Sequence, residues 1–277
     1  MKKIDVHCHT TNRIVADVDT PIPSISAIEK IMIEYEVEKT NLLATYFPHK
    51  QSGITNFRLL DWIGDRLNFS MFASLDFQYY PKQGLNEIKE LADRGKIAGI
   101  KIYTCYQVVD LESSTFKQLI EIAKRHSLPM MFHTGLSYAS MRKYNTPTVA
   151  EMFSAKRLEE TIFKNPSVNF ILSHMSKPFF EEIEYVCKRY PNAFTDMSGL
   201  IDSTYDSLEI PSSIGVIKKF LEICGPHKLM FGTDFPVQTH KDSINFIEEA
   251  MKGFSDKDKE DVYYYNADRI IYLKNKP

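Results

Sequence analysis

The chain has 277 residues, of which 43% are hydrophobic and 25% charged, and 34 basic against 36 acidic residues leave a formal net charge of −2. This composition is that of a globular protein and excludes an intrinsically disordered chain. The lack of a net positive charge argues against a nucleic-acid-binding protein, and no apolar run is long enough to cross a membrane. Length alone leaves one or two domains open.

Short apolar, β-branched runs alternate with segments of helical periodicity along the whole sequence. In chain order we predict strand Lys3–His9, helix Ser24–Lys39, strand Leu42–Pro48, helix Asn56–Arg66, strand Phe69–Asp76, helix Gln83–Arg94, strand Ile97–Tyr103, helix Ser113–His126, strand Pro129–His133, a helix from about Thr148 to Lys164, strand Val168–His174, helix Phe179–Arg189, strand Ala193–Ser198, helix Ile214–Cys224, strand Lys228–Asp234, helix Asp242–Lys252 and a helical tail to about Leu273. Eight such strand–helix units predict one α/β domain over residues 1–277, a (β/α)₈ TIM barrel. An open doubly wound sheet is the alternative, but no G-x-G-x-x-G motif follows the first strand.

The cysteines and the first residues bear on the compartment. Cys8, Cys105, Cys187 and Cys224 form no C-x-x-C pair, so a zinc ribbon or a dithiol redox motif is not expected. Polar residues interrupt any apolar stretch near the start of the chain. We expect a soluble, cytoplasmic protein.

Five polar side chains fall at the carboxyl ends of predicted strands: His7, His9, His133, His174 and Asp234. A barrel gathers these strand ends at one mouth. Each residue alone is more often a structural or turn residue than a ligand, but imidazoles and a carboxylate together suit a divalent metal such as zinc. The other histidines that we considered, His49, His126 and His240, are assigned no role.

The two-residue period of a strand predicts which side chains share a face. We expect one face to carry the site candidates in each strand, and these sets are Asp5, His7 and His9; Gly99, Lys101 and Tyr103; Phe170, Leu172 and His174; Met230, Gly232 and Asp234. In the first strand Ile4, Val6 and Cys8 would then face the helices.

Several segments of the chain resemble the amidohydrolase superfamily. They are most similar to its amidohydrolase-related branch, which includes amino-carboxymuconate-semialdehyde decarboxylase. The matching segments are Ile4–His9, Ala98–Tyr103, His133, Ile171–His174, Phe231–Pro236 and Tyr265–Ile270. The resemblance implies a (β/α)₈ barrel with a divalent metal at its mouth.

The resemblance also implies residue roles. His7, His9, His133 and Asp234 match the metal ligands of the family, and Asp234 doubles as the general base. His174 matches a histidine that orients or deprotonates the attacking water in members with one metal. In members with two metals, the same position binds the second ion.

Lys101 bears on the number of metals. In members with two metals a lysine on the fourth strand is carbamylated and bridges the ions, whereas the amidohydrolase-related branch often carries a lysine here with one metal only. We favour one ion, zinc or else manganese, with Lys101 and Tyr103 contacting the substrate. Tyr46, Tyr106 and Arg13, just beyond predicted strands, are expected to be scaffold rather than specific contacts.

The predicted activity is metal-dependent hydrolysis of a small carbonyl substrate, such as a lactone, ester or amide, by an activated water. The alternative is non-oxidative decarboxylation of a small aromatic or enoic acid. A barrel that binds a ligand without turnover, and a lactonase that needs no metal, are further hypotheses. A homodimer through Tyr263–Tyr265 stays open, although a C-terminal helix packed on its own barrel is the commoner arrangement.

Overall fold

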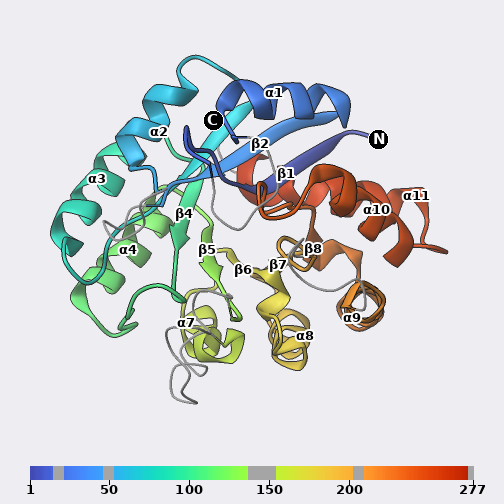
Figure 1. Ribbon diagram of the computed structural model, residues 1–277. Helices are drawn as coiled ribbons and strands as arrows, with labels where there is room; N and C mark the ends of the chain where they lie inside the picture. The colour runs from blue at the N-terminus through green and yellow to red at the C-terminus, as the bar shows by residue number, and fades with distance from the viewer. Residues whose placement is uncertain (15–21, 46–52, 137–153, 202–208, 274–277) are drawn as a thin grey trace.

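The computed structural model describes residues 1–14, 22–45, 53–136, 154–201 and 209–273. In this part of the chain a ring of parallel strands is surrounded by helices (Figure 1). The strands are β1 (Lys3–Cys8), β2 (Val37–Leu43), β3 (Phe69–Ala73), β4 (Gly99–Ile102), β5 (Met130–His133), β6 (Phe170–Ser173), β7 (Ala193–Asp196) and β8 (Leu229–Met230). The α-helices are α1 (Ile25–Glu34), α2 (Asn56–Ile63), α3 (Pro81–Asp93), α4 (Ser114–Arg125), α7 (Glu159–Lys164), α8 (Phe180–Arg189), α9 (Glu209–Cys224), α10 (His240–Ala250) and α11 (Asp256–Glu260). Short 3₁₀ turns η1 (Ala155–Leu158), η2 (His174–Ser176) and η3 (Pro226–Lys228) and π-helical turns η4 (Asp261–Tyr265) and η5 (Asp268–Tyr272) complete the described elements.

The strands pair in sequence order from β1 to β8, each parallel to the next. The ring closes between the first and last strands, where Val6 N donates to Phe231 O at 3.1 Å and His9 N donates to Phe235 O at 2.8 Å. The predicted (β/α)₈ barrel is therefore confirmed, and the doubly wound sheet is not formed.

Two apolar clusters fill the molecule. The larger one lies between the strands and the surrounding helices and includes Cys8, Ile100 and Ile102. The smaller one fills the interior of the barrel, with side chains from β1, β2, β3, β5, β6, β7 and β8: Ile4, Val6, Leu43, Phe72, Met131, Ile171, Phe194 and Met230. Because apolar side chains occupy the interior, the polar site is confined to the mouth.

The predicted helix Ser24–Lys39 is too long. The Ser24 side chain caps α1 as expected by accepting from Ala27 N, but the helix ends at Glu34 and β2 already begins at Val37. Glu36 has a φ of 56°, a left-handed conformation that a helix cannot continue through. The second strand is therefore earlier than predicted.

The predicted faces of the first strand are wrong for Ile4, Asp5 and Val6. The pairing of β1 with β2 places Asp5 opposite Thr40 and Cys8 opposite Leu42, so β1 has one extra residue between these pairs. Such a bulge changes which side chains face inward. Asp5 consequently points outward to His240 on α10, while Ile4 and Val6 pack in the barrel interior.

His174 reaches the mouth differently from the prediction. Phe170 and Leu172 pack in the outer cluster, and Ser173 is the residue of β6 that contacts Lys101 inside the barrel. His174 follows the strand in a left-handed turn with a φ of 61°, which brings its side chain inward. The strand period therefore gave the wrong face for Phe170 and Leu172, whereas His174 reaches the mouth as predicted but through the turn.

Other predictions fall partly outside the described residues. Tyr46, His49 and the start of the helix predicted from about Thr148 lie outside the described residues. The described part of that predicted helix forms η1 and α7. Within the described part, no helix is long and apolar enough to span a membrane.

Candidate metal centre at the barrel mouth

The carboxylate of Asp234 lies between His7 of β1 and His9, which follows directly after that strand. Its Oδ1 atom is 3.3 Å from His7 Nε2 and 3.1 Å from His9 Nε2. Asp234 is in the segment after β8, and its backbone N donates to His7 O at 2.7 Å. The main chain therefore ties the carboxylate directly to the end of β1, where His7 lies and after which His9 follows.

The two remaining predicted histidines lie beside this group. His174 Nε2 is 3.1 Å from His133 Nδ1, and the ring centroids of His7 and His174 are 4.7 Å apart. One potential metal-ligand atom from each of His7, His174 and Asp234 lies within 4.8 Å of the other two. The structure thus brings together all five side chains that the sequence singled out, with His133 joined to the others through His174.

A carboxylate that the sequence analysis missed orients two of these rings. Asp196, at the end of β7, is fully buried, and its Oδ2 lies 3.1 Å from His7 Nδ1. Its Oδ1 accepts from the backbone N of His174 at 3.1 Å. His174 Nδ1 in turn lies 2.9 Å from the carbonyl oxygen of Ser198. Because these Nδ1 atoms face acceptors, they carry the protons and the Nε2 lone pairs point to the mouth.

Electrostatics keeps the imidazoles of His7 and His174 neutral and the carboxylates of Asp234 and Asp196 ionised. Burial, reinforced by the charge of Lys101, lowers the pKa of His7 to about 4, and burial also lowers the pKa of His174. Burial alone would raise the pKa of Asp234, but the hydrogen bond from His9 and the neighbouring histidines outweigh it, so this pKa is well below its usual range. The same balance, dominated on the lowering side by His7, depresses the pKa of Asp196.

Gly199 allows the carboxylate and the imidazole to approach. It has a φ of 63°, and a Cβ atom there would lie 3.0 Å from both Asp234 Oδ2 and His174 Nδ1. Asp234 itself has a φ of 60°. Such left-handed residues cost free energy and often occur at functional sites. A glycine beyond a predicted strand gave no signal of this role in the sequence.

A second buried network supports the ligands from behind. Asp5 Oδ1 accepts from the backbone N atoms of His7 and Thr233, both at 3.1 Å. Asp5 Oδ2 accepts from the Thr233 hydroxyl at 2.7 Å and lies 3.1 Å from His240 Nε2. His240, which the sequence left without a role, is fully buried beside this carboxylate, and the hydrogen bonds of Asp5 to His7 and Thr233 hold β1 against the Asp234 segment.

The two predicted substrate contacts occupy different positions. Lys101 is fully buried below the mouth, where its Nζ donates to Ser173 Oγ at 3.1 Å. Tyr103, just beyond β4, lines the mouth, and burial raises the pKa of its hydroxyl well above the ordinary value. Tyr103 therefore stays a hydrogen-bond donor at neutral pH, whereas Lys101 acts on the site through its charge.

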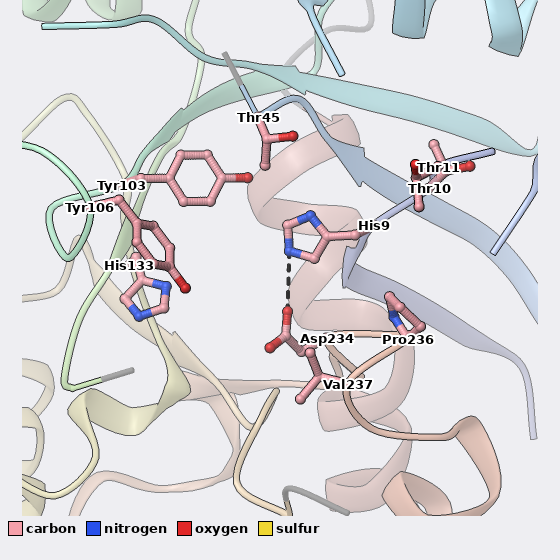
Figure 2. A pocket seen from close by; sticks show the side chains of 10 residues that line it. All are labelled: His9, Thr10, Thr11, Thr45, Tyr103, Tyr106, His133, Asp234, Pro236 and Val237. Carbon is pink, nitrogen blue, oxygen red and sulfur yellow. Dashed lines mark ion pairs between the residues drawn. The ribbon is translucent and has the colours of Figure 1, made fainter. Parts of the chain in front are cut away.

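Several side chains of the mouth border a cavity of about 120 Å³ (Figure 2). His9, Asp234, His133 and Tyr103 point into it, and the dashed line in Figure 2 marks the pair formed by His9 and Asp234. The described residues that line it are His9, Thr10, Thr11, Thr45, Tyr103, Tyr106, His133, Asp234, Pro236 and Val237. Tyr106, expected to be scaffold, therefore borders the cavity.

A sequence model of the amidohydrolases, described as "Amidohydrolase", matches residues 4–271, which is nearly the whole chain. This chain belongs to the amidohydrolase family. The likeness predicted from the sequence motifs is confirmed.

Known proteins resemble this amidohydrolase at low sequence identity. One curated relative, protein fluG of Emericella nidulans, is 22% identical over 170 residues, but the match spans 54% of this chain and only 18% of fluG. An amidohydrolase from Burkholderia multivorans superposes with a TM-score of 0.73 at 14% identity, covering 98% of this chain and 99% of that one. Another crystal form of the same protein has bound zinc.

Two further solved structures differ in reaction. A probable 2-pyrone-4,6-dicarboxylic acid hydrolase from Acinetobacter baumannii has a TM-score of 0.69 at 14% identity, covering 98% of this chain and 99% of that one. A dihydroxybenzoic acid decarboxylase from Polaromonas sp. JS666, with bound manganese, has a TM-score of 0.69 at 16% identity, covering 99% and 98%. Both reactions occur among proteins that share this fold.

The side chains of this amidohydrolase fit a divalent cation. A tetrahedral zinc site with ligand bonds of 2.0–2.1 Å separates its donor atoms by about 3.3 Å. The 3.1 and 3.3 Å separations around Asp234 Oδ1 match that spacing. Neutral His7 and ionised Asp234 are also in the protonation states that metal ligands require.

Proposed function

We propose that this protein is a metal-dependent hydrolase of a small lactone, ester or amide. The observation that carries the proposal is the convergence of His7 Nε2 and His9 Nε2 on Asp234 Oδ1 at the edge of a small cavity. His7, His9, Asp234 and His133 or His174 would hold one zinc or manganese ion. When bound, such an ion lowers the pKa of a water molecule and polarises a carbonyl group.

The chain's own residues would then move the protons. Asp234 Oδ1 faces His7 and His9, which leaves Oδ2 to accept the proton from the attacking water and to return it to the leaving group. His174 has its Nδ1 proton directed to Ser198 O, so its Nε2 atom is an acceptor; this atom lies 3.1 Å from His133 Nδ1 and would orient the water where the water replaces that contact. Tyr103 would donate to a substrate oxygen.

Lys101 has a different proposed role from the substrate contact expected from the sequence. Its ammonium group lies below the mouth and helps to keep His7 and His174 neutral. This arrangement supports a site with a single ion and an unmodified lysine. We also retain the cytoplasm as the proposed location, which suits four buried, free cysteines.

Decarboxylation of a small aromatic or enoic acid is the second candidate, since the manganese-containing structural neighbour is a decarboxylase. In that reaction the acid–base pair would protonate the carbon that loses CO₂. The two candidates differ in product, because only one releases CO₂.

A substrate panel with metal add-back tests the proposal. Chelator-treated protein would be assayed on lactones, esters, amides and hydroxybenzoates, before and after addition of Zn²⁺ or Mn²⁺. We expect metal-dependent release of a carboxylic acid without CO₂, and loss on the order of 10³-fold in Asp234→Asn. Release of CO₂ would favour the decarboxylase, and tight binding without turnover would contradict both reactions.

A further inference from the structure

A second cavity adjoins the first at the mouth of the barrel. It measures about 190 Å³, and Thr11 borders both cavities. Arg13, from the segment after β1, and Arg58 and Trp62, from α2, contribute to its walls. Arg58 and Trp62 are four residues apart and therefore lie on the same face of α2.

The first cavity is too small for more than the reacting end of a substrate. Its volume of about 120 Å³ is below the roughly 150 Å³ of a protein cavity that holds benzene. Because Thr11 borders both cavities, the adjoining space can take the remainder of a larger substrate.

The two cavities differ in charge. None of the ten described residues that line the first cavity is a lysine or arginine, and Lys101 lies buried below it. The described lining of the second cavity includes two guanidinium groups and no aspartate or glutamate. Guanidinium groups bind carboxylates and phosphates through paired hydrogen bonds.

We propose that this arginine pocket binds an anionic group, a carboxylate or a phosphate, at the end of the substrate remote from the reacting carbonyl. That the anion belongs to a substrate rests on the proposed function, whereas binding of the anion does not. The substrate class is then a small carbonyl compound with a terminal anion, held by Arg13 and Arg58 while Asp234 acts on its other end.

The sequence offers a built-in reporter for this site. Trp62 is the single tryptophan of the chain and lines the arginine pocket. Its fluorescence can be followed during titration with glutarate, inorganic phosphate or, as a neutral control, glutaramide. Glutarate and phosphate distinguish a carboxylate from a phosphate terminus.

We expect one of the two anions, but not glutaramide, to change Trp62 fluorescence saturably. Arg58→Gln should weaken that binding roughly tenfold or more, because a charge-assisted hydrogen bond is lost, and Arg58→Lys should lie between Arg58→Gln and the wild type. Arg13→Gln should act in the same direction. Arg125→Gln, an equal loss of charge at an exposed residue of α4, is the matched control and should bind like the wild type.

Equal anion affinity in Arg58→Gln, Arg13→Gln and the wild type would overturn the proposal, as would no fluorescence response to either anion. The titration needs neither metal nor turnover, so Asp234→Asn should keep the response while losing activity. A missing response in an active enzyme refutes only the arginine pocket. An intact response in a protein without metal-dependent turnover refutes only the proposed function.

Discussion

The two ends of the barrel use buried polar side chains in different ways. Near the amino ends of the strands, Lys228 donates to three backbone carbonyls, those of Tyr190, Pro191 and Ala193, at 2.8, 3.0 and 3.0 Å. At the mouth, His7 and Asp196 instead pair side chain to side chain.

This difference distinguishes residues that stabilise the fold from residues that can bind a ligand. A polar group whose hydrogen bonds all go to the main chain of neighbouring loops holds the fold and has no capacity left for a ligand. The mouth residues hold one another through one atom and leave a second atom, such as His7 Nε2, directed at the Asp234 carboxylate that borders the cavity. Burial of a polar side chain therefore does not by itself mark a functional site. What distinguishes the two cases is whether its partners are main-chain groups or other side chains.

The largest change in stability is expected for Lys228, near the amino ends of the strands. Lys228→Met keeps the apolar stem of the side chain but removes the donor to three carbonyls, so we expect a loss of about 4 kcal/mol in the free energy of unfolding. Urea denaturation measures it. The exposed Lys117→Met should change stability by less than about 0.5 kcal/mol. Loss of metal from a folded Lys228→Met protein would contradict the view that Lys228 supports the fold without affecting the mouth.

The mouth should show its own pH dependence in chelator-treated protein. The pKa of His7 is about 4 in the folded state against 6.5 ordinarily, so between these values the unfolded chain binds a proton that the folded chain does not. Stability therefore falls as the pH drops from 6.5 to 4, by up to about 3 kcal/mol from this group. Denaturation of wild type and His7→Gln across that range measures the difference. The same pH slope in both proteins would contradict a buried neutral His7.

A smaller effect is expected for the residue that orients the ligands. Asp196→Asn removes the negative charge facing His7 Nδ1, and loss of such a partner lowers metal affinity about 10- to 100-fold. Competition with a chromogenic chelator measures this affinity. Asp93→Asn, at an exposed aspartate that pairs with the half-buried His126, is the matched control and should leave the metal affinity unchanged. An unaltered affinity in Asp196→Asn would show that Asp196 only supports the fold.

The sequence predicted the barrel and the five side chains at its mouth because both depend on local patterns. Alternating strands and helices specify the topology, and His7, His9 and Asp234 lie near strand ends that the topology brings together. The exact faces were less predictable. The bulge in β1 turns Asp5 outward, and the left-handed turn at His174 follows no two-residue period.

The supporting residues could not be found from the sequence for a related reason. Asp196 and His240 take their meaning from partners distant in sequence, His7 and Asp5. An aspartate ending a strand and a histidine beginning a helix are common without such partners. Only the three-dimensional arrangement distinguishes them from ordinary cap or surface residues.

Elemental analysis of the purified protein, supplied with zinc or manganese, tests the central claim most directly. We predict about one equivalent of metal per wild-type chain, and little or none in folded His9→Ala and Asp234→Asn. A wild-type protein with full activity and no metal, or undiminished metal in both variants, would contradict the assignment of His7, His9 and Asp234 as a metal centre.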